Sequence, residues 1–251
     1  MSGHSKWATI KRKKGANDAK RAKIFTRLAK EITIAARDGG GDPEMNAGLR
    51  TAINNAKAQN MPNDNIDRAI KRGTGDQDGV SYEEKVYAGF YGGVAILVNA
   101  LTDNNNRTTA EVRHAFSKFN GKMVDTGSAA IYFERKGIIV VDEEKADEEK
   151  VMEVVLDAGA EDVESEDGLV TVTTPREAFH KVVKALEDAE IPAESADVQD
   201  LPTNTIAISG GDAEGLFKLI SFLDDLDDTS SVAANFDIPD DEMAKLQELY
   251  G

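Results

Sequence analysis

The sequence predicts an α+β protein in which an N-terminal three-helix domain is followed by two ferredoxin-like α/β domains, one inserted in the other. Two observations predict this class. Apolar residues recur at helical spacing as far as residue 73, whereas after residue 82 short strand-like runs alternate with amphipathic helices. The segment between the two regions, residues 73–81 (GTGDQDGVS), has the composition of a linker.

The first helix is expected from Asp18 onward, after an arm over residues 1–17 that shows no apolar periodicity. Its apolar stripe repeats every fourth residue, at Ile24, Leu28, Ile32 and Ala36, with Phe25 and Ala29 beside it. The three glycines from Gly39 to Gly41 are expected to end this helix.

Two shorter helices are expected next. Asp42 is the expected cap of the second helix, with Pro43 at its first position. The third is expected after Pro62, capped by Asn63 or Asp64. The residues predicted to face the core are Met45, Leu49, Ala52, Ile53, Ala56, Ile66, Ala69 and Ile70.

Strand periodicity begins with residues 86–90 and 94–98, which predict a hairpin across the turn at residues 91–93. Residues 103–107 read as a polar loop with Arg107 at its tip. Thr108 and Glu111 then have the spacing of a capping box that opens a helix.

The next segment predicts a β-α-β-β-α-β order. It begins with a hairpin or one long bent strand over residues 130–141, which is expected to break at residues 135–137, and continues into a helix that ends at Gly159. Strands near 162–165 and 169–173 follow, then a helix opened by a capping box at Thr174–Glu177, and a strand near 196–201. This order is typical of a ferredoxin-like unit with both helices on one face of an antiparallel sheet.

The last predicted elements complete the middle domain. Residues 205–208 and 232–236 read as strands around a helix at 213–223, and residues 240–250 as a final helix. The predicted domains are therefore residues 1–75, residues 80–132 plus 203–240, an insertion at residues 133–202, and a C-terminal helix at 240–251.

The composition excludes several classes of protein. The 251 residues contain no cysteine, which excludes thiol nucleophiles, disulfides and cysteine-based zinc sites. No apolar run approaches the roughly 18 residues that a membrane-spanning helix needs, and the N-terminus lacks the apolar core of a signal peptide. We therefore expect a cytoplasmic protein without a membrane partner.

Charge separation is the main functional signal. Residues 4–37 carry eleven lysines or arginines and two acids, a local charge of +9, in a chain whose formal net charge is -16. Such separation costs self-repulsion and indicates a polyanionic partner. Trp7 is expected either to stack on a base or to pack against the helical domain. The candidate nucleic-acid-binding residues are Lys6, Trp7, Lys11, Arg12, Lys13, Lys14, Lys20, Arg21, Lys23, Arg27 and, as a second-rank candidate, Arg107.

Other chemistry finds little support in the sequence. The three histidines lie on different elements without metal-ligand spacing. The triglycine turn before Asp42 follows a helix, which favours a plain turn over a phosphate cradle. The four acids between Asp224 and Asp228 resemble a solvated helix end more than a cation site. We expect no catalytic residues, no metal, no cofactor and no small-molecule substrate.

Several motifs resemble the YebC/PmpR family, which also includes the mitochondrial translational activator of cytochrome c oxidase. They are GHSKWATIKRKKGANDAKRAKIFTRLAKEI, GGGDPEMNAGLRTAI, NMPNDNIDRAI, DNNNRTTAEVRHAF and GSAAIYF. The resemblance covers essentially the whole chain from Gly3, so we expect no presequence and a bacterial form. It departs at Thr9, where the family usually has Asn, and at residues 87–93, where a proline-containing turn is expected.

The resemblance implies a helical domain followed by two α/β domains, and a DNA-binding regulator of transcription. Some family members look like ribosome-associated factors that help translation through consecutive prolines, which implies ribosomal RNA and the ribosome as alternative partners. The hypothesis from the sequence is a non-enzymatic nucleic-acid-binding regulator of gene expression. A protein-interaction module remains the alternative from another class.

Overall fold

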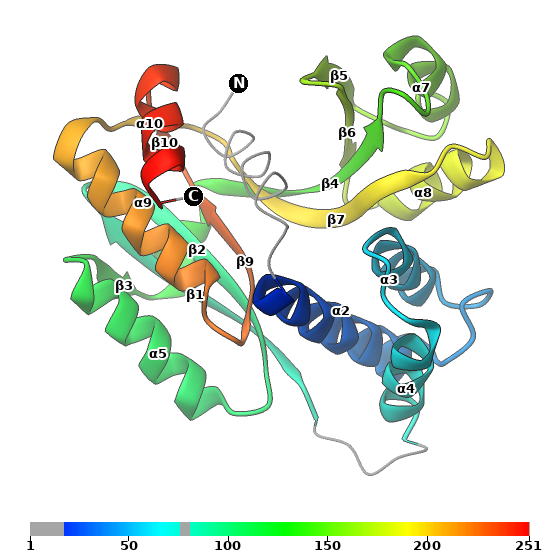
Figure 1. Ribbon diagram of the computed structural model, residues 1–251, viewed down its shortest axis with the longest axis horizontal. Coiled ribbons are helices and arrows are strands. Elements are labelled where there is room, and N and C mark those ends of the chain that lie inside the picture. Colours follow the sequence, from blue (N-terminus) through cyan, green and yellow to red (C-terminus); the bar gives the residue numbers. More distant parts are fainter. Residues whose placement is uncertain (1–17, 76–80, 251) are drawn as a thin grey trace. The chain divides into compact units, whose positions relative to one another are not determined.

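The computed structural model describes residues 18–75 and 81–250 (Figure 1). The described residues divide into two compact units. Unit 1 falls within Met1–Arg27, Ser81–Glu134 and Asp200–Gly251, and unit 2 within Leu28–Val80 and Arg135–Gln199. None of the described helices is both long and apolar enough to cross a membrane.

Unit 1 is built on a four-stranded sheet with the order β3-β1-β2-β9, in which every neighbouring pair is antiparallel. Helices α5 and α9 lie on one face of this sheet (Figure 1). Its strands and helices are β1 (Glu83–Tyr91), β2 (Val94–Thr102), α5 (Asn105–Lys118), β3 (Lys122–Val124), α6 (Thr126–Ala130), β8 (Ile206–Ala207), α9 (Gly210–Asp224), β9 (Thr229–Ala234), β10 (Phe236–Asp237) and α10 (Asp240–Tyr250).

The core of unit 1 lies between the sheet and its two helices. Side chains of alternate β2 residues meet fully buried side chains such as Phe116 of α5 and Leu216 of α9. The β1–β2 hairpin turns at Gly92 and Gly93, which have φ values of 55° and 89°. Both values suit glycine in a two-residue turn that matches strand twist. The predicted hairpin is confirmed, but its turn is one residue shorter than predicted, because Tyr91 pairs with Val94.

Local details of unit 1 correct three expectations. The prediction of a capping box at Thr108 was wrong, because α5 begins at Asn105 and Asn104 accepts a hydrogen bond from the Arg107 amide (3.1 Å). Arg107 therefore lies in the first turn of a helix and not at a loop tip. The two short elements β3 and α6 were not predicted. Residues 206–207 do not join the main sheet but pair in parallel with β10.

Unit 2 combines helices from the N-terminal region with a second sheet. Its elements are the C-terminal part of α2 (Asp18–Gly39), α3 (Ala47–Ala58), α4 (Asn63–Gly73), most of β4 (Phe133–Asp142), α7 (Glu148–Val155), β5 (Asp162–Glu166), β6 (Leu169–Pro175), α8 (Phe179–Asp188) and most of β7 (Ala193–Pro202). The sheet order is β5-β6-β4-β7, with α7 and α8 on one face (Figure 1). This is the strand order of a ferredoxin-like unit, so the predicted β-α-β-β-α-β arrangement is confirmed.

Several helix or strand boundaries in unit 2 differ from the prediction. The third helix, α4, begins at Asn63 after Pro62 and has no side-chain cap, so the predicted cap at Asn63 or Asp64 was wrong. Asp42 does not cap a helix, because its carboxylate accepts the Glu44 amide in a turn, and Asn46 instead caps α3 by accepting the Leu49 amide (3.0 Å). Met45, predicted to be buried, is 83% exposed as a result. The predicted capping box at Thr174–Glu177 was wrong, because β6 runs through Pro175 and α8 begins at Phe179 without a side-chain cap. The predicted break at residues 135–137 was also wrong, because β4 continues through them.

The predicted class is confirmed: the chain is α+β, with an N-terminal helical region and antiparallel sheets. The domain boundaries drawn from the sequence stay a prediction.

Candidate nucleic-acid interface

The candidate interface divides into residues within and outside the described part of the chain. Lys6, Trp7 and the run from Lys11 to Lys14 lie outside the described residues, and Lys20 lies in the first turn of α2. Four candidates have described side chains: Arg21, Lys23, Arg27 and Arg107.

Arg21 is exposed on α2, and its guanidinium lies 5.4 Å from the centroid of the Phe25 ring. A cation over an aromatic face at this distance is attracted by the ring quadrupole. The contact leaves the charge in water, so Arg21 is accessible to an external phosphate.

Lys23 and Arg27 contact other parts of unit 1. The Lys23 ammonium donates to the carbonyl of Asp224, the last residue of α9 (2.6 Å), and lies 3.8 Å from the Asp225 carboxylate. The Arg27 guanidinium donates to the carbonyl of Ser230 in β9 (3.2 Å). The basic side of α2 is therefore turned, at these two positions, toward the connection between α9 and β9.

Arg107 contacts the same connection from α5. Its guanidinium donates to Asp228 (2.6 Å) and Asp103 (2.7 Å), and Asp228 also accepts hydrogen bonds from the hydroxyls of Thr102 and Thr108. The Asp228 side chain is 2% exposed, so its charge is balanced inside the protein. Hydrogen bonding first to Asp228 and then to Asp103 raises the already high pKa of Arg107, which keeps it a cation.

Sequence reasoning missed the place where these side chains meet. We call residues Asp224–Ser230 the 224–230 segment. It receives Lys23, Arg27 and Arg107, three of the four described candidates. The one available signal was the opposite charge of its four aspartates, which the sequence analysis assigned to a solvated helix end.

Two alternatives to a nucleic-acid site are a phosphate cradle at the triglycine turn and a metal site. At the triglycine turn the Asn46 amide donates to the carbonyls of Ala35 (2.7 Å) and Gly40 (2.9 Å), and a Cβ on Gly39 would meet the Asn46 side chain at 2.5 Å. The Asn46 side chain thus packs against the turn and bonds to carbonyls on its helix side. Within residues 18–75 and 81–250, no group of three His, Asp or Glu side chains is placed to hold a metal ion.

The environment of His180 lowers the pKa of its imidazole. Partial burial, followed by the positive charge of Arg50, lowers the pKa of His180 from its usual 6.5. Its ring packs against Phe179 at 5.1 Å between centroids.

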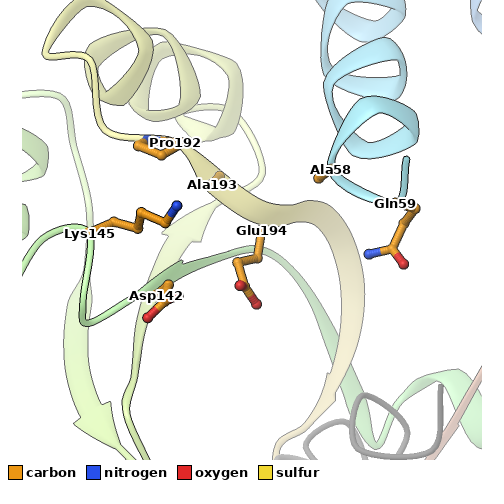
Figure 2. Close-up of a pocket in the computed structure, with 7 residues that line it drawn as sticks. All are labelled: Ala58, Gln59, Asp142, Lys145, Pro192, Ala193 and Glu194. Carbon is orange, nitrogen blue, oxygen red and sulfur yellow. The ribbon is translucent and has the colours of Figure 1, made fainter. Parts of the chain in front are cut away.

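A small depression in unit 2 has a volume of about 240 Å³. Figure 2 shows the Lys145 side chain extending toward Ala193 and Glu194, with Asp142 below it and Gln59 at the end of α3. Typical ligand pockets measure about 300–1,000 Å³ and are mainly apolar. The depression is smaller than such a pocket, and three of the seven residues that line it are charged.

Comparison with known proteins identifies the relatives of this chain. Residues 5–76 match the family described as "TACO1/YebC protein N-terminal domain", and residues 82–236 match "TACO1/YebC second and third domain". A "Probable transcriptional regulatory protein" of Syntrophotalea carbinolica is 54% identical over 98% of this chain and 99% of its own length, and one of Desulfatibacillum aliphaticivorans is 52% identical over 98% and 100%.

A solved structure has the same fold. The crystal structure of a conserved hypothetical protein from Aquifex aeolicus superposes with a TM-score of 0.82 at 43% identity, over 89% of this chain and 93% of that one. The two family matches together cover most of the chain, and the relatives align over nearly their whole length. The resemblance read from the motifs is therefore confirmed, and the chain belongs to the TACO1/YebC family.

Proposed function

We propose that this protein is a non-enzymatic regulator of gene expression that binds the phosphate backbone of a nucleic acid through the cations of residues 4–37. The observation that carries the proposal is the local charge of +9 at one end of a chain with a net charge of -16. Phosphate neutralisation by Lys and Arg supplies most of the affinity in sequence-independent binding. The acidic remainder repels nucleic acid and confines the contact to that end.

Regulation of transcription through DNA is the first form of this proposal. It is supported by the curated relatives, which are named probable transcriptional regulatory proteins and match over essentially their full length. In this form the protein acts in the cytoplasm on duplex DNA.

Ribosomal RNA is the second candidate target, and the burial of α2 favours it. From Leu28 onward this helix buries Lys30 and Thr33 as well as its apolar stripe, because it is part of a core. A helix used in this way cannot lay its whole length in the major groove to read base edges. Recognition of RNA by its shape and its phosphate backbone, as in ribosomal RNA, requires only the exposed start of α2 and the residues before it.

Charge reversal tests the proposal. Replacing Lys11, Arg12, Lys13 and Lys14 with Glu should abolish binding to labelled duplex DNA and to a labelled ribosomal RNA hairpin. With about six phosphate contacts, the wild-type affinity should fall roughly 10³-fold between about 50 and 200 mM salt. Fluorescence anisotropy across a salt series measures both. Equal affinity of the variant and the wild type would remove the arm from the site, and salt-insensitive binding would favour a protein-interaction module.

Sedimentation of cell lysate distinguishes the two targets. On sucrose gradients run with and without DNase, co-migration with ribosomal particles that is lost in the four-glutamate variant would identify a ribosome-associated factor. Sedimentation that DNase abolishes would identify a DNA-binding regulator. A control for the loss of a lysine outside residues 4–37 is Lys184→Gln, which removes an exposed lysine paired with Asp188 in α8.

A further inference from the structure

The 224–230 segment binds cations from two separate helices. Lys23 and Arg27 donate to its backbone carbonyls from α2, and Arg107 binds its buried Asp228 from α5. To contact a phosphate, each of these side chains would have to give up a charged hydrogen bond that it already makes within unit 1. Such bonds are among the stronger ones in proteins.

The carbonyls of Asp224 and Ser230, which accept from Lys23 and Arg27, lie where the regular hydrogen bonding of a helix or sheet is interrupted. Asp224 ends α9, and the last four carbonyls of a helix have no acceptor role within it and form the negative end of the helix dipole. Ser230 is the extra residue of a β-bulge, since Ser231 pairs with Asn99 and Thr229 with Ala100. Lys23 and Arg27 therefore satisfy backbone acceptors that the fold itself exposes.

Arg21 lies on a different side of α2 from Lys23 and Arg27. At 100° per residue, it lies about 200° around α2 from Lys23, and so on the opposite side of the helix. It is exposed and contacts the Phe25 ring. The same helix thus has one basic side that contacts the 224–230 segment and one that faces solvent.

We propose that Lys23, Arg27 and Arg107 are positioning residues of the nucleic-acid interface and not phosphate contacts. Lys23 and Arg27 hold the start of α2 on the 224–230 segment, and Arg107 holds that segment in place through Asp228. Together they set the point from which Arg21 and the cations before it reach the nucleic acid. The inference rests on the proposed function, and it narrows the set of residues that contact phosphate.

The salt dependence of binding separates the two roles. Each phosphate contact contributes about 0.9 to the slope of log affinity against log salt on duplex DNA. We expect Arg21→Gln to reduce that slope by about 1, as a phosphate contact should. Lys23→Gln and Arg27→Gln should leave the slope unchanged while lowering affinity about tenfold, since each loses one charged hydrogen bond that orients the helix. Arg107→Gln should behave in the same way, although it lies on a different helix.

Hydrogen exchange gives a readout that needs no nucleic acid. The backbone amides of residues 225–230 should exchange faster in Lys23→Gln and Arg27→Gln than in the wild type, and at the wild-type rate in Arg21→Gln and in Lys184→Gln. Lys23→Gln changes a partly exposed side chain, so the fold should survive it, as circular dichroism would verify.

The outcomes are distinct. A slope reduced by about 1 in Lys23→Gln or Arg27→Gln would show a direct phosphate contact and overturn the inference. Unchanged affinity together with unchanged exchange would also overturn it. Wild-type protein that shows no salt-dependent binding to either probe would instead contradict the proposed function, and the exchange rates would still test how α2 is held.

Discussion

Asp228 shows how a single buried charge organises unit 1. Its carboxylate accepts hydrogen bonds from Thr102 (3.1 Å), Thr108 (2.7 Å) and Arg107, on two elements that are distant from it in sequence. Arg107 itself is 42% exposed, so it delivers its charge to the buried carboxylate from the surface. Removing the Asp228 carboxylate would take away the acceptor that these three donors share.

The first stability prediction concerns this residue. Asp228→Ala should lower the free energy of unfolding by about 2–4 kcal/mol, because two buried hydroxyls and a guanidinium lose their common acceptor. Urea unfolding followed by circular dichroism measures the change. Asp103→Asn, which alters only the outer partner of Arg107, should cost about 0.5 kcal/mol or less. Equal losses in the two variants would contradict a special role for Asp228.

Errors in the prediction at the residue scale have a common cause. Asp42 and Thr108 are good caps by type, yet Asn46 and Asn104 cap the helices that follow. Several capping side chains occur within a few residues in both segments, and local preference alone does not choose among them. The choice depends on tertiary contacts, such as those that Thr108 makes to Asp228 inside the fold.

At the scale of elements, α3 is joined to strand β7 by one side chain. The Asn55 amide donates to the carbonyl of Ala196 (2.8 Å), and its oxygen accepts the Ala196 amide (2.9 Å). β7 is an edge strand of its sheet, and edge strands carry backbone groups that need partners. Asn55 therefore supplies a bridge of the kind that another strand would make. Asn55 is 9% exposed. Nothing in the sequence indicated that this polar helix residue would bond to the backbone of a strand.

Three helices end in the same way, two of them with Asn and one with Glu at the left-handed position. Asn60 after α3, Asn120 after α5 and Glu190 after α8 all have φ near 60° and are followed by an amide that bonds back to the carbonyl five residues earlier. This is the Schellman motif, which favours Gly or Asn at the left-handed position. Glu190 is the unfavourable choice, since a Cβ strains this conformation.

Glu190→Gly should therefore stabilise the protein by about 0.5–1 kcal/mol, because glycine adopts a positive φ without strain. Thermal unfolding measures the gain. Glu190→Ala is the matched control, because it removes the same charge and keeps the Cβ; a gain of equal size in the alanine variant would attribute the effect to charge.

Long elements were predictable and short ones were not. The helices from Asp18 to Gly39 and from Asp240 to Tyr250 were located correctly, since several turns of apolar periodicity identify a helix. The three-residue strand β3 and the five-residue helix α6 contain too few residues to show a period. The pairing of β8 with β10 depends on residues thirty positions apart in sequence, Ile206 and Phe236.

At the scale of the whole molecule, the net charge of the chain affects the stability of the folded state. The acids of the chain outnumber its bases by sixteen, although residues 4–37 are strongly basic. Repulsion among like charges opposes a compact state, and salt reduces it over a Debye length of about 8 Å at 0.15 M.

Thermal stability should accordingly rise when ionic strength increases from about 0.01 to 0.15 M. The rise should be larger in the variant with Glu at positions 11–14, because each reversal removes two charges and the formal net charge becomes -24. Differential scanning calorimetry at fixed pH measures both. A melting temperature independent of salt in both proteins would show that the acidic surface carries no net repulsion.

Composition, periodicity and motifs were sufficient for the α+β class, the main elements, the family and the basic end of the chain, because these features depend on residues close together in sequence. The partners of the candidate cations were not accessible in this way. Lys23, Arg27 and Arg107 contact residues 201, 203 and 121 positions away in the chain. The sequence shows which side chains are charged and how they are spaced. Which group each charged side chain contacts depends on how distant segments pack together.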